Sequence, residues 1–222
     1  TQEPLDFYRC RHGLGYTVIS GKKGGLSLEQ AMLVPREDNC LLLKLTVRNE
    51  TAAEQRLTLF PYVEFCLWDA MDDSSNFQRN FSTGEVEIES NALYHKTEYR
   101  ERRDHYAFLW SDKPYDGFDT SRDAFLGVYG SPARPRAVLE GHCIGSHAHG
   151  WAPVGAMEFD VALAPGEEKQ LVLGLGYIEN PQEEKFVAPS VINKAHAHAM
   201  MAKYASPAAF DAALEDLRQF WG

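Results

Sequence analysis

The residues best suited to chemistry lie in the segment from Trp68 to Phe81. Amide and guanidinium side chains gather there beside two phenylalanines. Planar hydrogen-bonding groups next to aromatic rings suit sugar hydroxyls and the oxygens of phosphate. The segment is longer than a hairpin turn needs, and long loops on a rigid scaffold often carry binding residues. A second interpretation stays open, in which the side chains only hold the loop to its neighbours. The four candidates are Asn76, Gln78, Arg79 and Asn80.

Three carboxylates of the same segment, Asp69, Asp72 and Asp73, are groups that glycoside hydrolysis requires. In that reaction one acid and one base flank the scissile bond. Acidic residues that cluster in sequence more often form the surface of a loop. We therefore assign them no catalytic role from their pattern.

One cluster offers potential zinc ligands, with the pattern H-C-x-x-x-H-x-H: His142, Cys143, His147 and His149. Zinc accepts imidazole and thiolate ligands. The spacing matches no common structural zinc site, however, and three glycines interrupt the segment. A flexible turn is the favoured interpretation, and we predict no metal site.

A second glycine-rich segment, Arg11–Thr17, contains the pattern G-x-G. A dinucleotide-binding fingerprint needs a third glycine at the right offset and a following helix. The residues after Thr17 provide neither. We predict a tight turn whose glycines adopt positive φ angles.

The elements that must position these residues are mostly strands. In residues 40–49, leucines and a valine alternate with lysine, threonine and arginine. Similar alternation predicts strands over 56–65, 83–89, 158–163 and 169–177, and the sequence Ala-Pro-Gly-Glu at 164–167 indicates a hairpin between the last two. Period-two alternation at short spacing predicts an all-β fold, a two-sheet antiparallel β-sandwich.

The C-terminal part of the sequence changes to a helical period. Helices are predicted from Ile192 to Met201 and from Ser206 to Trp221, the second capped by Ser206 with proline at its first position. Its apolar residues form one stripe. Because the chain offers this stripe no helical partner, we expect another domain to cover it. We predict a sandwich domain over 1–190 and a helical linker over 191–222.

Composition limits the partners of the chain. Asp and Glu number 32 against 22 Lys and Arg, a formal net charge of −10 that repels a phosphate backbone, so we expect no nucleic-acid binding. The one dense basic patch, Arg100, Arg102 and Arg103, is interrupted by acids. We expect no membrane span, no secretory signal, four reduced cysteines, no cofactor and a cytoplasmic location.

Seven strings in this sequence resemble cellobiose phosphorylases of glycoside hydrolase family 94. The most specific is NFQRNFSTGEVE, residues 76–87, and the strings occur in family order over nearly the whole chain. The others are RHGLGYT (11–17), VEFCLWDA (63–70), YHKTEYRERRDHYAF (94–108), GFDTSRDAFLG (117–127), AHGWAPVGA (148–156) and LGYIENPQEEKF (175–186).

The resemblance implies a supersandwich-like domain that begins after its first strands and ends with one or two linker helices. A missing (α/α)₆ barrel would follow. It also implies inverting phosphorolysis, in which cellobiose and phosphate give α-glucose 1-phosphate and glucose. Phosphate is then a co-substrate, and the catalytic acid belongs to a barrel segment with no counterpart here. We therefore assign no catalytic residue to this chain.

The resemblance further implies a homodimer in which a sandwich loop of one subunit borders the active site of the other. Asn76–Asn80 corresponds to that loop, with Gln78 and Arg79 the main candidates for contact with the acceptor sugar or phosphate. Arg11, His12 and Tyr16 are weaker candidates. Two alternatives remain: a phosphorylase for cellodextrin, laminaribiose or chitobiose, and a carbohydrate-binding or purely structural sandwich without an enzyme.

Overall fold

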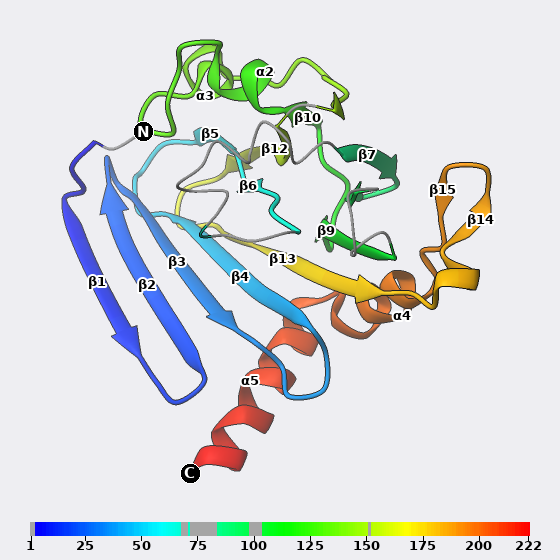
Figure 1. Cartoon of the computed structure of the whole chain (residues 1–222). Helices are drawn as coiled ribbons and strands as arrows, with labels where there is room; N and C mark the ends of the chain where they lie inside the picture. The colour runs from blue at the N-terminus through cyan, green and yellow to red at the C-terminus, as the bar shows by residue number, and fades with distance from the viewer. Residues whose placement is uncertain (1–2, 68–70, 72–83, 98–103, 151) are drawn as a thin grey trace.

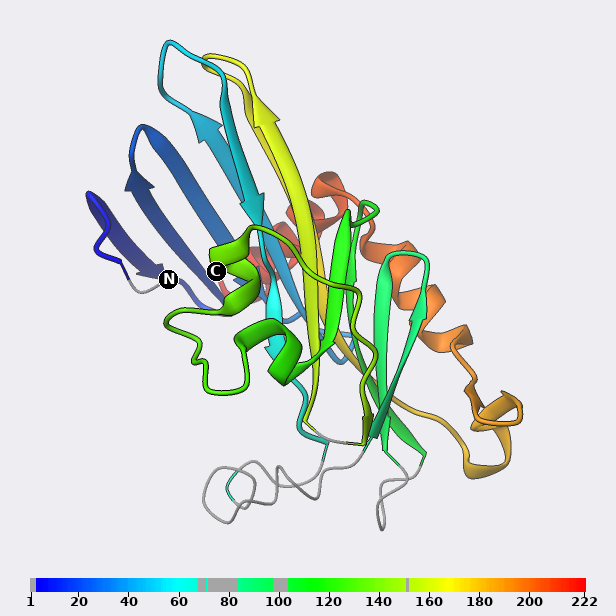
Figure 2. The same ribbon diagram turned by 90° about the horizontal axis from the view of Figure 1, so that it is seen from above.

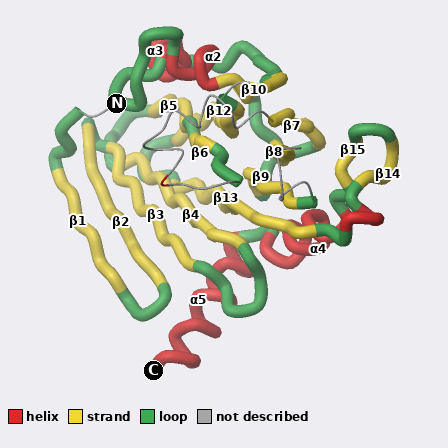
Figure 3. Tube along the Cα trace, in the orientation of Figure 1, coloured by secondary structure: helices red, strands yellow, loops and turns green. Residues whose placement is uncertain are grey.

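The computed structural model describes residues 3–67, 71, 84–97, 104–150 and 152–222. Two antiparallel sheets face each other, and two helices cover the outer face of the larger sheet (Figures 1 and 2). Strands dominate the trace and the helices are few (Figure 3). The predicted all-β sandwich is confirmed.

The large sheet has nine strands in the order β1-β2-β3-β4-β13-β9-β8-β7-β11. All of its neighbouring pairs are antiparallel. Its strands are β1 (Phe7–His12), β2 (Tyr16–Lys23), β3 (Leu26–Leu33), β4 (Cys40–Asn49), β7 (Gly84–Glu89), β8 (Ala92–Thr97), β9 (His105–Ser111), β11 (His149–Gly150) and β13 (Glu168–Glu179).

The facing layer is smaller. Its sheet has the order β10-β12-β5, and β6 also pairs with β12. This small layer consists of β5 (Gln55–Leu59), β6 (Tyr62–Glu64), β10 (Gly117–Ser121), α2 (Arg122–Leu126), α3 (Arg136–Glu140) and β12 (Pro153–Leu163). The chain then continues through η3 (Gln182–Glu184), the paired strands β14 (Phe186–Ala188) and β15 (Val191–Ile192), α4 (Ala195–Tyr204) and α5 (Pro207–Trp221).

Strand β4 has the bounds and the alternation that its sequence predicts. Leu43 and Leu45 face the small layer, where they pack against the inter-sheet core. Leu42 points the other way and is fully buried beneath the helices. The large sheet is therefore covered on both faces at β4. The alternation of leucine with lysine and threonine predicted only one covered face.

The single strand predicted over 56–65 is wrong. The structure divides it into β5 and β6, which pair with different parts of β12. Pro61 lies between them and has no N–H for a ladder, while its carbonyl accepts a hydrogen bond from the amide of Met157 at 3.0 Å.

The predicted hairpin at 164–167 is also wrong, because β12 and β13 belong to different sheets. The turn carries the chain across the sandwich, as does the connection from β4 to β5. Asn49 joins the two crossovers: its side-chain amide donates to the carbonyls of Leu163 and Ala164 at 3.1 Å, and its backbone N–H donates to the carbonyl of Glu167 at 3.0 Å. A fully buried asparagine therefore closes this end of the sandwich.

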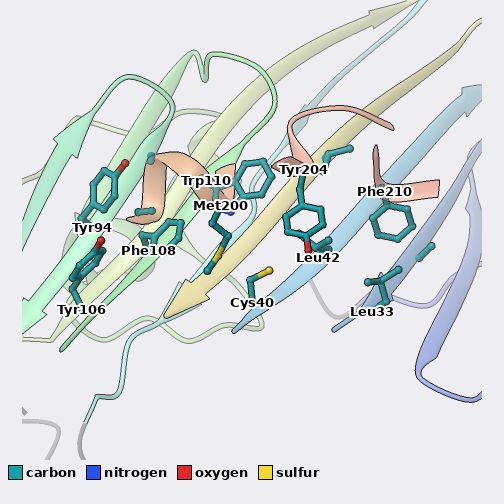
Figure 4. Close-up of a cluster of buried hydrophobic side chains, with 14 of the residues drawn as sticks. Leu33, Cys40, Leu42, Tyr94, Tyr106, Phe108, Trp110, Met200, Tyr204 and Phe210 are labelled. Atoms are coloured by element: carbon teal, nitrogen blue, oxygen red, sulfur yellow. The ribbon is translucent and has the colours of Figure 1, made fainter. Parts of the chain in front are cut away.

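The C-terminal helix α5 begins where predicted, and Ser206 Oγ accepts the amide of Ala209 at 3.1 Å. Most of its apolar stripe needs no other domain, because it packs on the outer face of the large sheet, where Phe210 is fully buried and Leu217 almost so. Trp221 at the end of the stripe is 54% exposed. Figure 4 shows Phe210 and Tyr204 beside Leu42 of β4 and Leu33 of β3. The boundary at residue 190 stays a prediction.

Two glycines of β13 accommodate large aromatic rings on the same outer face. A Cβ at Gly174 would lie 2.2 Å from Trp110 Nε1, and one at Gly176 would lie 2.3 Å from Phe108 Cζ. The rings of β9 therefore lie across β13 only because these positions have no side chain (Figure 4).

All four cysteines are free, in agreement with the prediction of reduced thiols. Only Cys40 is buried, and desolvation there raises its pKa to about 12. Cys66 is exposed. Among the described helices, none is long and apolar enough to cross a membrane.

Candidate functional site

The sequence-predicted binding residues Asn76, Gln78, Arg79 and Asn80 lie outside the described residues. So do Asp69, Asp72, Asp73 and the arginines at 100, 102 and 103. The described residues that flank the candidate loop are the end of β6 with Phe65 and Leu67, and the start of β7 at Gly84. The site is therefore built from these flanks.

His95 of β8 lies between the two flanks of the loop. Its imidazole stacks on the ring of Phe65, with 5.1 Å between centroids and 19° between planes. Gly84 lies against the same imidazole, because a Cβ there would be 2.3 Å from His95 Cε1. One buried side chain thus sets the positions at which the chain leaves β6 and enters β7.

The environment of His95 keeps its imidazole neutral. The side chain is 2% exposed, and desolvation lowers its pKa to about 4, against a smaller opposite effect of a hydrogen bond with the backbone of Glu85. Nδ1 has no hydrogen-bond partner within the described part of the chain. A neutral, enclosed imidazole serves here as a packing group between the two flanks.

An open groove of about 640 Å³ lies beside the first flank. Phe65, Leu67 and Leu175 give it an apolar wall, and Asn39, Glu64 and Tyr177 add polar groups. Few polar groups on an apolar surface are typical of small-molecule sites.

The Glu64 carboxylate in this groove is already engaged. Tyr62 Oη donates to it at 2.7 Å, and Arg122 Nε donates at 3.0 Å. Because these two donors come from β6 and α2, Glu64 connects the strand before the loop to the helical part of the small layer. Its first role is to hold that strand in place.

A second polar cluster lies at the same end of the sandwich. His105 Nε2 is 3.5 Å from Asp104 Oδ1 and 3.3 Å from Glu179 Oε1, and Tyr177 Oη hydrogen-bonds to its Nδ1. One imidazole and two carboxylates could bind a divalent transition metal. The same distances also fit a histidine that pairs directly with two acids. Because no further observation in the described residues points to a metal, we interpret the cluster as a structural group of paired side chains.

The four residues with zinc-ligand character do not gather. Within the described residues, the three-donor group is the one around His105, and His142, Cys143, His147 and His149 contribute nothing to it. The His147 ring meets the Phe118 ring edge-on, with 5.4 Å between centroids. Burial, and then the carboxylates of Asp119 and Glu158, raise the pKa of Cys143.

Two buried acids organise this loop through its backbone. Asp119 Oδ1 accepts the amide of Ser146 at 2.9 Å, and a carboxylate oxygen of Glu158 accepts the amide of Cys143 at 2.6 Å. The segment is therefore an ordered turn held by carboxylates, as distinct from the flexible turn that its glycines suggested.

The segment Arg11–Thr17 comprises the end of β1, a turn at 13–15 and the start of β2. Gly15 has φ +81°, as predicted, whereas Gly13 has no positive φ and is required for another reason: a Cβ there would lie 2.1 Å from the Tyr16 ring. Arg11 and His12 are successive strand residues and point to opposite faces of the sheet, so they do not form one site.

Sequence reasoning missed a row of carboxylates on the outer face of β7. Glu87 accepts an ion pair from Lys96 at 3.3 Å and from Lys194 at 2.7 Å, and both lysines are buried. His198 Nε2 of α4 lies 2.9 Å from Glu89. These contacts fix the segment before α4 to the sheet. The signal in the sequence was the spacing of Glu85, Glu87 and Glu89 by two, from which only a strand was predicted.

Comparison with known proteins identifies the domain type. The family described as "Glycosyl hydrolase 94, supersandwich domain" matches residues 1–207. N,N'-diacetylchitobiose phosphorylase of Vibrio furnissii is 26% identical over 96% of this chain and 25% of its own length. Solabiose phosphorylase of Paenibacillus borealis is 30% identical over 74% of this chain and 21% of its own length.

A third relative is named as a synthase and not as a phosphorylase. Cyclic beta-(1,2)-glucan synthase NdvB of Rhizobium meliloti is 28% identical over 97% of this chain and 7% of its own length. The chain spans about a quarter or less of the curated relatives that it matches.

Proposed function

The chain belongs to the glycosyl hydrolase 94 supersandwich family, and from this membership we propose that it is the sandwich part of an inverting disaccharide phosphorylase. The observation that carries the proposal is the family match over residues 1–207. The phosphorylase relatives support the reaction type. In the proposed reaction, cellobiose and phosphate give α-glucose 1-phosphate and glucose.

The chemistry divides between this domain and the rest of the protein. A phosphate oxygen forms a bond to C1 of the donor glucose while the glycosidic C1–O bond breaks on the opposite face. A general acid protonates the departing oxygen. Because phosphate is the nucleophile, no second carboxylate is needed to activate water. We propose that the acid lies outside residues 1–222, so that this domain contributes no catalytic residue.

The contribution that we propose for this domain is a wall of the active site of a partner subunit in a homodimer. The loop with Gln78 and Arg79 forms that wall, and Asn76 and Asn80 flank it. The proposal is supported by the firm packing of both loop flanks around His95, since a binding loop needs a fixed base.

Substrate choice is tested by phosphorolysis assays on the full-length protein. Release of glucose 1-phosphate is measured with cellobiose, cellodextrins, laminaribiose and N,N'-diacetylchitobiose in separate reactions with phosphate. We expect the highest kcat/KM with cellobiose. A higher value with another disaccharide would move the proposal to that substrate, and no phosphate-dependent cleavage of any of them would refute the phosphorylase.

The role of the loop is tested by Arg79→Ala in the full-length protein. Loss of a charge-assisted hydrogen bond of about 1.5–3 kcal/mol should raise KM for phosphate or for the acceptor sugar by about tenfold or more. Arg79→Lys keeps the charge without the planar fork and should recover part of the loss. Arg48→Ala, an exposed arginine on β4, is the matched control and should have wild-type kinetics. Unchanged kinetics in Arg79→Ala would remove the loop from the site.

A carbohydrate-binding sandwich without an enzyme is the alternative of a different class. Isothermal titration of the 222-residue chain with glucose and cellobiose separates the two. A sugar-binding module binds without other domains, whereas the proposed wall should show no binding by itself.

A further inference from the structure

Strand β7 begins at Gly84, directly after the loop segment that carries Gln78 and Arg79 in the sequence. Strand β8 pairs with β7 along its whole length on one side. On the other side, β11 pairs only with Gly84 and Glu85, so residues 86–89 have no second strand neighbour within the described ranges. The position of β7 therefore depends on the contacts that its two faces make.

The inner face of β7 is held by apolar packing. Val86 is buried in the core between the two sheets, and Ile88 packs against the same core. Such contacts remove apolar surface from water, but they are non-directional, so they tolerate small displacements of a strand. The contacts that define the place of β7 more closely are therefore expected on its outer face.

On the outer face, the Glu87 carboxylate receives donors from three separate elements. Lys96 Nζ of β8 lies 3.3 Å away, and Lys194 Nζ, just before α4, lies 2.7 Å away. The backbone N–H of Ile192 in β15 donates to Glu87 Oε1 at 3.0 Å. Both lysines are buried, at 3% and 7% exposure, so solvent screens these interactions poorly. Glu87 thus connects β7 to its neighbouring strand, to the hairpin β14–β15 and to the segment that leads into α4.

Each lysine has one further acidic partner. Lys96 also pairs with Glu85 at 3.1 Å, and Lys194 also pairs with Glu89 at 3.2 Å. Among the ion pairs of the described residues, Glu87 is the carboxylate that both lysines share. Removing its charge would therefore divide the row into two independent pairs, whereas a change at Glu85 or Glu89 would leave the connection through Glu87 intact.

We infer that Glu87 is a positioning residue for the phosphorylase reaction. By fixing β7 to the hairpin and to α4, it keeps in place the base of the loop that bears Gln78 and Arg79. It thereby supports the contact of that loop with phosphate or with the acceptor sugar. The inference rests on the proposed function of the loop. The effect passes through the backbone of β7, without contact between Glu87 and the substrate.

A purely stabilising role for this cluster is the alternative. A buried ion pair adds little to stability compared with apolar side chains of similar volume, because the cost of desolvation offsets the attraction. Such a pair does restrict geometry, since hydrogen bonds between charged groups are short and directional. The burial of Lys96 and Lys194 around one carboxylate, beside the strand that follows the loop, is therefore better explained by position than by stability.

Glu87→Gln in the full-length protein tests the inference. Glutamine keeps the shape of the side chain and an acceptor for the amide of Ile192, and it removes the charge that both lysines share. Kinetics are measured in both directions, with the preferred disaccharide plus phosphate and with glucose 1-phosphate plus the acceptor sugar. KM for phosphate or for the acceptor should rise about fivefold or more while kcat changes less than about twofold, because a loop that binds ground state and transition state alike affects KM. Glu50→Gln is the matched control and should have wild-type KM values, since Glu50 also pairs with a lysine at 2.7 Å, at the opposite end of the sandwich.

The double variant Glu87→Gln/Lys194→Met separates position from stability. Methionine fills the volume of Lys194 without a charge, so the double variant should regain most of the stability toward urea that Glu87→Gln loses. Its KM should stay high, because the connection through Glu87 is still broken. Wild-type KM values in folded Glu87→Gln, or recovery of KM together with stability in the double variant, would overturn the inference.

Hydrogen exchange gives a readout that is independent of activity. Backbone amides of β7 should exchange at least about tenfold faster in Glu87→Gln than in wild type, and those of β13 should be unchanged. Equal exchange in β7 would show that Glu87 does not hold the strand and would also overturn the inference. If the wild-type protein catalyses no phosphorolysis, the proposed function fails by that result alone, while the exchange of the β7 amides decides the role of Glu87 separately.

Discussion

The buried imidazole of His95 makes the stability of the domain depend on pH in a defined window. Its pKa falls from 6.5 to about 4 on folding because burial disfavours the charged form. Above pH 6.5 the imidazole is neutral in both states. Between pH 6.5 and 4 the unfolded chain binds a proton that the native state does not bind, so the free energy of unfolding decreases as pH falls. One pKa unit corresponds to about 1.4 kcal/mol, which gives a loss of about 3 kcal/mol between pH 7 and pH 4.

The perturbation that isolates this effect is His95→Phe. The variant keeps an aromatic ring against Phe65 and removes the titrating group. Urea unfolding of wild type and variant, followed by circular dichroism at half-unit steps from pH 4 to 7.5, gives the free energy of unfolding for each. The wild-type value minus the variant value should fall with decreasing pH and level off near pH 4.

The difference between the two free energies of unfolding cancels the contributions of the other titrating groups. Burial raises the pKa of Asp112, and hydrogen bonds from Lys203 and Tyr204 outweigh burial and lower that of Asp38. Both groups are present in wild type and variant, so their contributions cancel. His142→Asn, at an exposed histidine, is the control and should leave the pH dependence unchanged. If the difference between wild type and His95→Phe is the same at pH 4 and pH 7, the imidazole is accessible to protons and the argument from burial fails.

Three further changes test the packing by urea unfolding. Gly176→Ala places a methyl group against the Phe108 ring and should lower the free energy of unfolding by about 1–3 kcal/mol. Phe210→Ala removes a fully buried ring between α5 and the sheet and should cost about 3–5 kcal/mol, whereas Phe220→Ala, at a half-exposed ring, should cost about 1 kcal/mol or less. Ser206→Ala removes the cap acceptor of α5 and should cost about 1 kcal/mol, most of which Ser206→Asp should restore. If a variant is as stable as wild type, the contact that it removes or crowds does not contribute to stability as argued.

Local patterns in the sequence were sufficient for most of the elements. Residues 40–49 alternate and form one strand, and Ser206 starts a helix because a hydroxyl cap and a following proline act within one turn. Pairing between elements was less predictable. The turn at 164–167 has the residues of a hairpin, yet it crosses between sheets because Asn49, far away in sequence, holds it beside the β4–β5 connection. A local pattern contains no information about such a partner.

The packing of the last helix, α5, also depends on partners that a local sequence pattern cannot identify. The apolar stripe of α5 was correctly predicted, and its partner was not, because the outer face of the large sheet is assembled from strands that are far apart in sequence. Leu33, Leu42 and Trp110 come from β3, β4 and β9. Apolar residues adjoin each of them in sequence, so the local pattern does not show which face of the strand the helices cover. Only their assembly creates an apolar surface that a helix can bury.

The two ends of the sandwich have different roles, and the strand register explains why. Arg48 pairs with Glu168 at one end of the β4–β13 ladder, and Cys40 pairs with Gly176 toward the other. At the first end the chain crosses between the sheets twice, and Asn49 ties the crossovers together. At the second end lie the flanks of the long loop, with His95 between them. Because the crossovers hold the two sheets together there, we expect that end to tolerate few insertions. The loop that we propose to border a partner's active site lies at the opposite end, on strands whose positions are already set.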